Sequence, residues 1–174
     1  MYPPARLDHW RMLRDNSGII TPLYPLCLAM SLVTLKPPDY AGLLKSLDEN
    51  AWIVVCFCAD WCGSCREYRP QMEALADLRQ DARFFWVDIE DHADMMGELD
   101  IDKFPTISIQ RGNIVAFYSC IHPDAKLAER ILQSMMDETP ETLARLAQSN
   151  DERRAWQKDC NFRTMLQNGL DAGS

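Results

Sequence analysis

The sequence contains no run of about 18 consecutive apolar residues, the length that a helix needs to cross a membrane. Positive charge is also scarce: 18 lysines and arginines stand against 26 acidic residues, and the net charge is −8. An acidic surface is poorly suited to the phosphates of nucleic acids or anionic lipids. We therefore expect neither a membrane-spanning protein nor one that binds nucleic acid.

The sequence also lacks a clear export signal and a disulfide framework. Apolar residues between 18 and 35 are interrupted by Pro22 and Pro25, and no small-residue cleavage site follows them. The seven cysteines are odd in number, and most of them occupy apolar, strand-like segments. This usage is typical of reduced thiols in the cytoplasm, so we expect a cytoplasmic protein.

Zinc-ligand spacing is missing as well. There is one Cys-x-x-Cys pair, without a second pair or a matching pair of histidines. We expect His92 and His122 to be surface or helix-capping residues, and we expect no bound metal. Four cysteines are close in sequence: Cys56, Cys58, Cys62 and Cys65. The first two should face the core, away from a shared metal site. A metal-handling protein that uses the last two as soft ligands nevertheless stays one possible function.

The stretch Trp61-Cys62-Gly63-Ser64-Cys65 joins two segments of different periodicity. Residues 52–58 are apolar, β-branched and aromatic, which predicts a buried strand. Beyond Cys65, apolar residues recur at spacings of three and four up to Leu78, which predicts an amphipathic helix. Cys62 should therefore lie where a strand leads into a helix N-terminus.

That position favours thiol chemistry. The first turn of a helix has unpaired amides and a positive dipole, and both stabilise a thiolate. We expect Cys62 to have a depressed pKa, within the range of about 3.5–7.5 found for Cys-x-x-Cys thiols. Arg66 and Arg69 should add positive charge nearby. Cys65 lies on the same helix face, so it can resolve a mixed disulfide formed by Cys62.

The remaining pattern predicts an α/β domain with a mixed sheet covered by helices on both faces. Its strands are expected at residues 32–35, 52–58, 84–89, 106–110 and 114–118, with the fourth alternating as a half-buried strand does. We divide the chain into an N-terminal extension (1–30), one domain (31–137) and a helical C-terminal extension (138–174). Met30 could be an alternative start of translation.

The C-terminal extension is expected to begin a helix at Thr139 and Pro140. A final helix, anchored by Trp156, Cys160 and Phe162, should end before Asn168-Gly169. We expect these helices to pack on the domain, although binding to a partner is the alternative.

Three features of the sequence resemble the thioredoxin family. The first is residues 59–65, Ala-Asp-Trp-Cys-Gly-Ser-Cys, directly after an apolar strand. The second is Pro70, at the place of a helix-kinking proline. The third is Phe104-Pro105-Thr106, which is similar to the family's cis-proline loop facing the active site. The resemblance implies a thioredoxin-like fold with N- and C-terminal extensions.

The resemblance also implies a thiol–disulfide oxidoreductase, with Cys62 as the nucleophile and Cys65 as the resolving thiol. Electrons would travel in the cysteines, so no cofactor is expected. The partners would be disulfide-containing protein substrates and an upstream disulfide reductase. The substrate groove would be formed by Trp61, Gly63, Ser64, Phe104, Pro105, Thr106 and Cys120. Backbone groups of Thr106 could pair with a substrate strand, and Cys120 could form a mixed disulfide or regulate the site.

The sequence differs from the family pattern at three places. Cys56 stands where the family usually has a buried aspartate, Trp86 stands in place of its accompanying lysine, and Ser64 replaces the proline between the two cysteines. These differences motivate the alternative of a thioredoxin-like binding module with little turnover. We expect Cys56 and Cys58 to share one strand face as small buried hydrophobes, with a reserve thiol pair as the other possibility.

Overall fold

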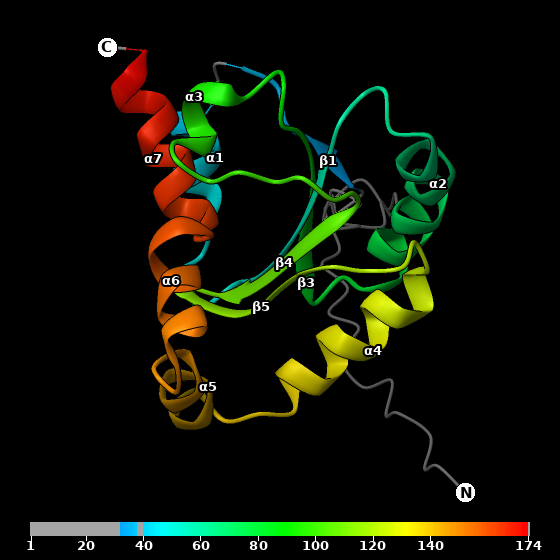
Figure 1. The fold of residues 1–174 in the computed structure, drawn as a ribbon. Coiled ribbons are helices and arrows are strands. Elements are labelled where there is room, and N and C mark those ends of the chain that lie inside the picture. The colour runs from blue at the N-terminus through cyan, green and yellow to red at the C-terminus, as the bar shows by residue number, and fades with distance from the viewer. Residues whose placement is uncertain (1–31, 38–39, 174) are drawn as a thin grey trace, which may run out of the picture.

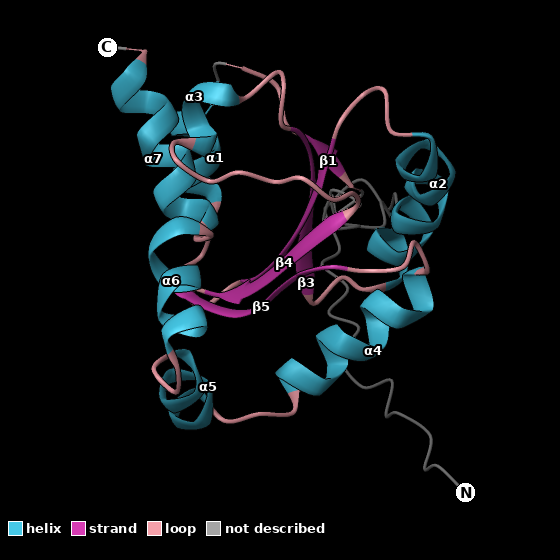
Figure 2. Cartoon of the chain, in the orientation of Figure 1, coloured by secondary structure: helices cyan, strands magenta, loops and turns pink. Residues whose placement is uncertain are grey.

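The computed structural model describes residues 32–37 and 40–173, and the expectations for the N-terminal extension and for Met30 lie outside this part. Five strands of this described part form one sheet in the order β1-β3-β2-β4-β5 (Figures 1 and 2). Their bounds are β1 Val33–Thr34, β2 Trp52–Cys58, β3 Ala82–Asp88, β4 Thr106–Arg111 and β5 Ile114–Cys120. Strands β1, β2 and β3 run parallel to one another. Strand β4 pairs antiparallel with β2, and β5 pairs antiparallel with β4. The predicted mixed sheet is confirmed.

Helices cover both faces of this sheet, as predicted (Figure 1). Their bounds are α1 Tyr40–Ser46, α2 Gly63–Leu78, α3 Ala93–Met96, α4 Ala125–Met136, α5 Pro140–Ala147, α6 Asp151–Asp159 and α7 Phe162–Ala172. The pair α2 and α4 lies on one side, and the other five helices lie on the opposite side. Within the described residues, no helix is both long enough and apolar enough to span a bilayer.

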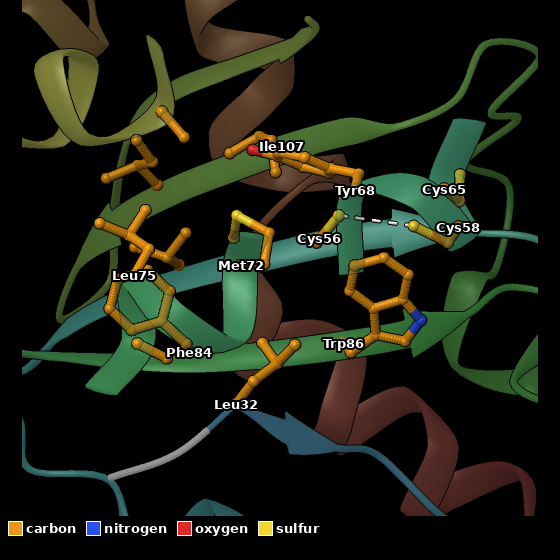
Figure 3. Close-up of a cluster of buried hydrophobic side chains, with 14 of the residues drawn as sticks. Leu32, Cys56, Cys58, Cys65, Tyr68, Met72, Leu75, Phe84, Trp86 and Ile107 are labelled. Atoms are coloured by element: carbon orange, nitrogen blue, oxygen red, sulfur yellow. Dashed lines mark hydrogen bonds between the residues drawn. The ribbon is translucent and has the colours of Figure 1, made fainter. Parts of the chain in front are cut away.

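The central strand β2 separates two hydrophobic cores. Val54, Cys56 and Cys58 face α2 and α4, where they pack in one buried cluster (Figure 3). Ile53 and Val55 face the other way, toward α1, α3 and α7. A strand whose alternate side chains are buried on opposite faces has no polar side, which explains the continuous apolar run in the sequence.

Strand β4 is buried on both faces, so its prediction as a half-buried strand is wrong. Ile107 and Ile109 face α2 and α4, whereas Ser108 and Gln110 are also fully buried. The Gln110 side-chain amide donates to the carbonyl of Gly112 over 2.7 Å and its oxygen accepts from the Phe162 amide over 2.8 Å. The C-terminal helices cover this face of β4. Because the Gln110 side chain is hydrogen-bonded in this way, it can be buried at low free-energy cost.

The C-terminal helices pack on the domain, as predicted. Phe162, Met165 and Leu166 of α7 are at most 2% exposed and belong to the core beneath β2 and β3. The predicted single final helix is instead two helices, because Asn161 starts a new one: its side-chain oxygen accepts the amide of Arg163 over 3.1 Å.

The predicted end of the last helix at Asn168-Gly169 is also wrong. Helix α7 continues to Ala172, and Gly169 is buried inside it against the ring of Tyr40. A Cβ atom at residue 169 would lie 2.6 Å from Cε2 of that ring. This glycine therefore permits close packing of two helices and does not mark a helix end.

Candidate active site

Cys62 lies at the N-terminus of α2, where the sequence places it. The chain turns after β2, with the Cys62 amide donating to the carbonyl of Ala59 over 2.9 Å. Cys62 is the N-cap residue of α2, and its Sγ accepts the backbone N–H of Cys65 over 3.2 Å. A sulfur at this position faces the unpaired amides of the first helical turn.

The two cysteines are joined as a disulfide, with their Cα atoms 5.3 Å apart. Cys62 is 6% exposed and Cys65 is 1% exposed, so Cys62 is the more accessible sulfur. The Sγ of Cys62 is also 3.3 Å from Oγ of Ser64, and both Gly63 and Ser64 are exposed beside it. The expectation that the two sulfurs can meet is confirmed.

The two arginines expected near Cys62 have different surroundings. Arg66 turns back toward the active-site loop, where its guanidinium donates to the carbonyl of Asp60 over 2.8 Å. Arg69 is engaged elsewhere: it donates to Oγ1 of Thr34 over 2.6 Å and to Glu73 over 3.1 Å. Of the two, Arg66 is therefore the one held against the active-site loop.

An aromatic surface lies next to the disulfide. Trp61 is 65% exposed, although its indole N–H donates to Oε1 of Glu90 over 3.0 Å. Its ring meets Phe104 edge to face, with centroids 5.5 Å apart and an interplanar angle of 86°. The Phe104–Pro105 bond is cis, as predicted. Trp61 and Phe104, which are both predicted to line the substrate groove, thus touch and form one surface.

Thr106 begins β4, and its predicted contact with substrate stays a prediction. Thr106 is 3% exposed, and its register partners are Phe57 on β2 and Cys120 on β5. Its hydroxyl donates to the carbonyl of Lys103 over 2.7 Å. At Thr106, β4 thus has a neighbouring strand on each side.

Cys120 is exposed at the end of β5, opposite Thr106. The next residue, Ile121, donates its amide to the carbonyl of Pro105 over 3.2 Å. Cys120 also lines a surface cavity of about 290 Å³ together with Tyr118 and Trp156. The structure thus places Cys120 beside the cis-proline loop, and its role in substrate binding stays a prediction.

The residues that depart from the family pattern are neighbours in the sheet. Cys56 on β2 is in register with Trp86 on β3, and Cys56 is fully buried. Burial raises the pKa of the Cys56 thiol well above its ordinary value, and the nearby Cys58 raises it further through a hydrogen bond and through charge. This position thus holds a neutral thiol where the resemblance indicates that the family usually has a carboxylate.

His92 is not the surface residue that we predicted. It occupies the N-cap position of α3 but makes no capping hydrogen bond, and its side chain is 1% exposed. Its Nδ1 lies 2.6 Å from the Tyr40 hydroxyl and its Nε2 lies 3.2 Å from the Leu35 carbonyl. The ring is therefore a satisfied core histidine, whereas His122 is exposed as expected. Among the described residues, no group of three or more histidines, cysteines or acids could hold a metal ion.

Two residues of the site were missed by the sequence analysis. Glu90 binds the Trp61 indole from 29 residues away, and no local pattern signals that contact. Tyr68 lies one helical turn beyond Cys65 and is fully buried, yet its hydroxyl has no hydrogen-bond partner among the described residues. Its helical spacing from Cys65 places it on the same face, which is the one signal that could have identified it.

Comparison with known proteins gives a consistent result. A family model described as Thioredoxin matches residues 32–133 of the 174-residue chain. Thioredoxin H2 from Arabidopsis thaliana is 30% identical over 100 residues, which cover 57% of this chain and 65% of that protein. The chain thus spans just under two thirds of that relative.

Solved structures agree on the fold. The short form of thioredoxin F from spinach chloroplast has a TM-score of 0.54 at 20% identity, covering 63% of this chain and 96% of its own. A chain from a complex of ferredoxin:thioredoxin reductase with thioredoxin f2 has the same TM-score of 0.54 at 18% identity. The match covers 63% of this chain and 98% of that chain. The helices α5, α6 and α7 lie beyond the matched residues 32–133.

Proposed function

Because this chain belongs to the thioredoxin family, whose members are protein-disulfide oxidoreductases, we propose that it exchanges disulfide bonds with protein substrates through Cys62 and Cys65. The observation that carries this proposal is the Cys62–Cys65 disulfide at the N-terminus of α2, with the more exposed sulfur at the N-cap. A dithiol that can open and close at the protein surface is the chemical requirement for this exchange.

The reduced protein acts in two steps. The Cys62 thiolate attacks one sulfur of a substrate disulfide, forms a mixed disulfide and releases the other substrate sulfur as a thiolate. Cys65 then loses its proton and attacks Sγ of Cys62, which releases the second substrate thiolate and leaves the Cys62–Cys65 disulfide. Two electrons have passed to the substrate. The helix N-terminus stabilises the Cys62 thiolate whenever it forms.

The aromatic surface beside the disulfide binds the substrate. Trp61 is large, exposed and held in place by Glu90 and Phe104, so it offers contact area without losing much conformational freedom on binding. Gly63 and Ser64 are exposed at the rim, and they leave room for a substrate segment to approach Cys62.

A separate reductase returns electrons to the oxidised pair if the protein works as a reductant. The complex of ferredoxin:thioredoxin reductase with thioredoxin f2 is a precedent for such a partner among structures of the same fold. We place this cycle in the cytoplasm, because seven cysteines without a disulfide framework suit a reducing compartment.

Reduction of a protein disulfide, with dithiothreitol as the electron source, tests the proposal. Cys62→Ser should abolish turnover, and Cys65→Ser should accumulate a mixed disulfide that gel electrophoresis without reductant detects. Cys27→Ser, outside the motif, is the matched cysteine control and should turn over normally. A wild-type protein that binds the substrate but does not reduce it would instead support the binding-module alternative.

A further inference from the structure

A second pair of sulfurs lies beneath the active-site disulfide. Cys56 and Cys58 occupy the same face of β2, and their Sγ atoms are 3.4 Å apart (Figure 3). Their exposed fractions are 0% and 2%. A disulfide requires about 2.0 Å between sulfurs, so the side chains already point toward each other and must close by a further distance of about 1.4 Å.

This sulfur pair shares a buried cluster with the resolving cysteine. Cys65 belongs to the same buried cluster as Cys56 and Cys58, and Figure 3 shows Cys58 between Cys56 and Cys65. The three cysteines therefore line the inner side of the active site, and bulk solvent reaches none of them freely.

The surroundings favour a neutral Cys56 thiol in the resting protein. Burial is the main cause of the raised Cys56 pKa, and Cys58 adds to it. The buried Tyr68 hydroxyl, which no hydrogen bond within the described part of the chain satisfies, also has a raised pKa, again mainly through burial and then through Cys56 and Cys58. Neutral buried thiols react slowly with outside oxidants, so a disulfide inside the cluster is the oxidant that they can reach.

We propose that Cys56 and Cys58 form a second, internal dithiol that passes two electrons to the Cys62–Cys65 disulfide. This inference rests on the proposed oxidoreductase function, because the active-site disulfide is the oxidant.

The exchange balances in two steps. Cys58 loses its proton, and its thiolate attacks Sγ of Cys65, which forms a Cys58–Cys65 disulfide and releases the Cys62 thiolate. Cys56 then loses its proton and attacks Sγ of Cys58, which forms the Cys56–Cys58 disulfide and releases the Cys65 thiolate. The two protons end on Cys62 and Cys65. The active-site pair is reduced, and the internal pair is oxidised by the same two electrons.

A fully reduced chain would then hold electrons for two substrate disulfides. The first substrate oxidises Cys62 and Cys65, the internal pair reduces them again, and a second substrate is reduced without an outside electron donor. Trypsin releases residues 46–66 as one peptide with all four cysteines, so the state of both pairs can be counted in a single fragment.

The test begins with fully reduced protein freed of reductant, to which an excess of a disulfide-bonded protein substrate is added. Acid quenching, denaturation and alkylation then show by mass which cysteines of peptide 46–66 are still free. We expect two substrate disulfides reduced per wild-type chain and no free thiol in the peptide. Cys56→Ala with Cys58→Ala, the matched control, should reduce one, a twofold difference. Cys62→Ser with Cys65→Ser should leave Cys56 and Cys58 free, because their route runs through Cys65.

The outcomes separate this inference from the proposed function. If the active-site pair cycles while Cys56 and Cys58 stay fully alkylated at the end point, the internal dithiol is overturned and the oxidoreductase stands. If Cys62 and Cys65 do not cycle, both fail, because the internal pair has lost its oxidant. The number of free cysteines in peptide 46–66 of the wild-type protein tests the internal dithiol even if the alanine variant does not fold.

Discussion

The indole N–H of Trp61 donates to Oε1 of Glu90 over 3.0 Å, which holds a 65% exposed aromatic ring beside the active-site sulfurs. The contact joins the loop before α2 to the segment after β3. An exposed tryptophan fixed by a hydrogen bond is suited to binding, because little side-chain entropy is lost when a partner covers it.

We therefore predict that Trp61→Ala raises the KM for a protein disulfide substrate several-fold, with little change in the melting temperature. Glu90→Ala should have a smaller effect in the same direction, because the ring keeps its contact with Phe104. Leu78→Ala is the matched control: Leu78 is 68% exposed at the other end of α2. Steady-state kinetics on the three variants check this, and equal effects of Trp61→Ala and Leu78→Ala would refute the assignment of the aromatic surface.

A second prediction concerns the close approach of α7 to α1. In Gly169→Ala the new Cβ would lie 2.6 Å from a ring carbon of Tyr40, and that ring is held by the bond from its hydroxyl to His92. Overpacking of this kind costs about 1–3 kcal/mol. Gly173→Ala, with its nearest neighbour 3.6 Å away, should be close to neutral. Urea unfolding measures both, and equal stabilities would contradict the packing described for Gly169.

The C-terminal helices should be required for stability. Phe162 is fully buried, and its ring centroid lies 5.0 Å from that of Phe85 on β3, with the two rings tilted by 35°. We expect Phe162→Ala to lower the free energy of unfolding by about 3–5 kcal/mol. Thr164→Ala, at an exposed position of the same helix, is the control for helix propensity. A loss below 1 kcal/mol at Phe162, measured by denaturant titration, would mean that α7 is a dispensable appendage.

The sequence predicts the active site better than the C-terminal region, and the reason is physical. The strand, the Cys-x-x-Cys turn and the helix that follows are defined by residues close in sequence, such as Cys62 and Cys65. The burial of His92 and Gln110 depends on segments far along the chain: His92 binds Tyr40, 52 residues away, and Gln110 binds Phe162, 52 residues away. Local periodicity carries no information about such partners.

The two errors in the final helices have different origins. Asn161 starts a helix through a local cap, but apolar spacing around it continues and conceals the break. Glycine often follows the last residue of a helix, but at position 169 the ring of Tyr40 leaves no room for a side chain. A local cap therefore decides the first boundary, and tertiary packing decides the second.

Stability should fall at alkaline pH because of a buried thiol. Burial raises the pKa of Cys160 to about 12 from an ordinary value of 9.0, and the charge of Asp159 contributes in the same direction. The folded state therefore favours the protonated thiol, so its contribution is complete below pH 9.0 and is lost as the pH rises toward about 12.

Melting temperatures between pH 8 and pH 12 check this pH dependence. Cys160→Ala should start from a lower stability, because it leaves a cavity, but its stability should fall less steeply with pH. Cys120→Ser removes an exposed thiol and should keep the wild-type slope. Parallel curves for wild type and Cys160→Ala would show that another group causes the alkaline transition.

The central claim is that Cys62 and Cys65 form a working redox couple. Equilibration of the protein in glutathione buffers, followed by alkylation and mass analysis of these two cysteines, tests it most directly. We predict a reversible two-electron couple with a reduction potential between about −270 and −180 mV, the range of thioredoxins, glutaredoxins and disulfide isomerases. Failure of these two cysteines to show any reversible couple would contradict the account and leave a thioredoxin-like binding module in its place.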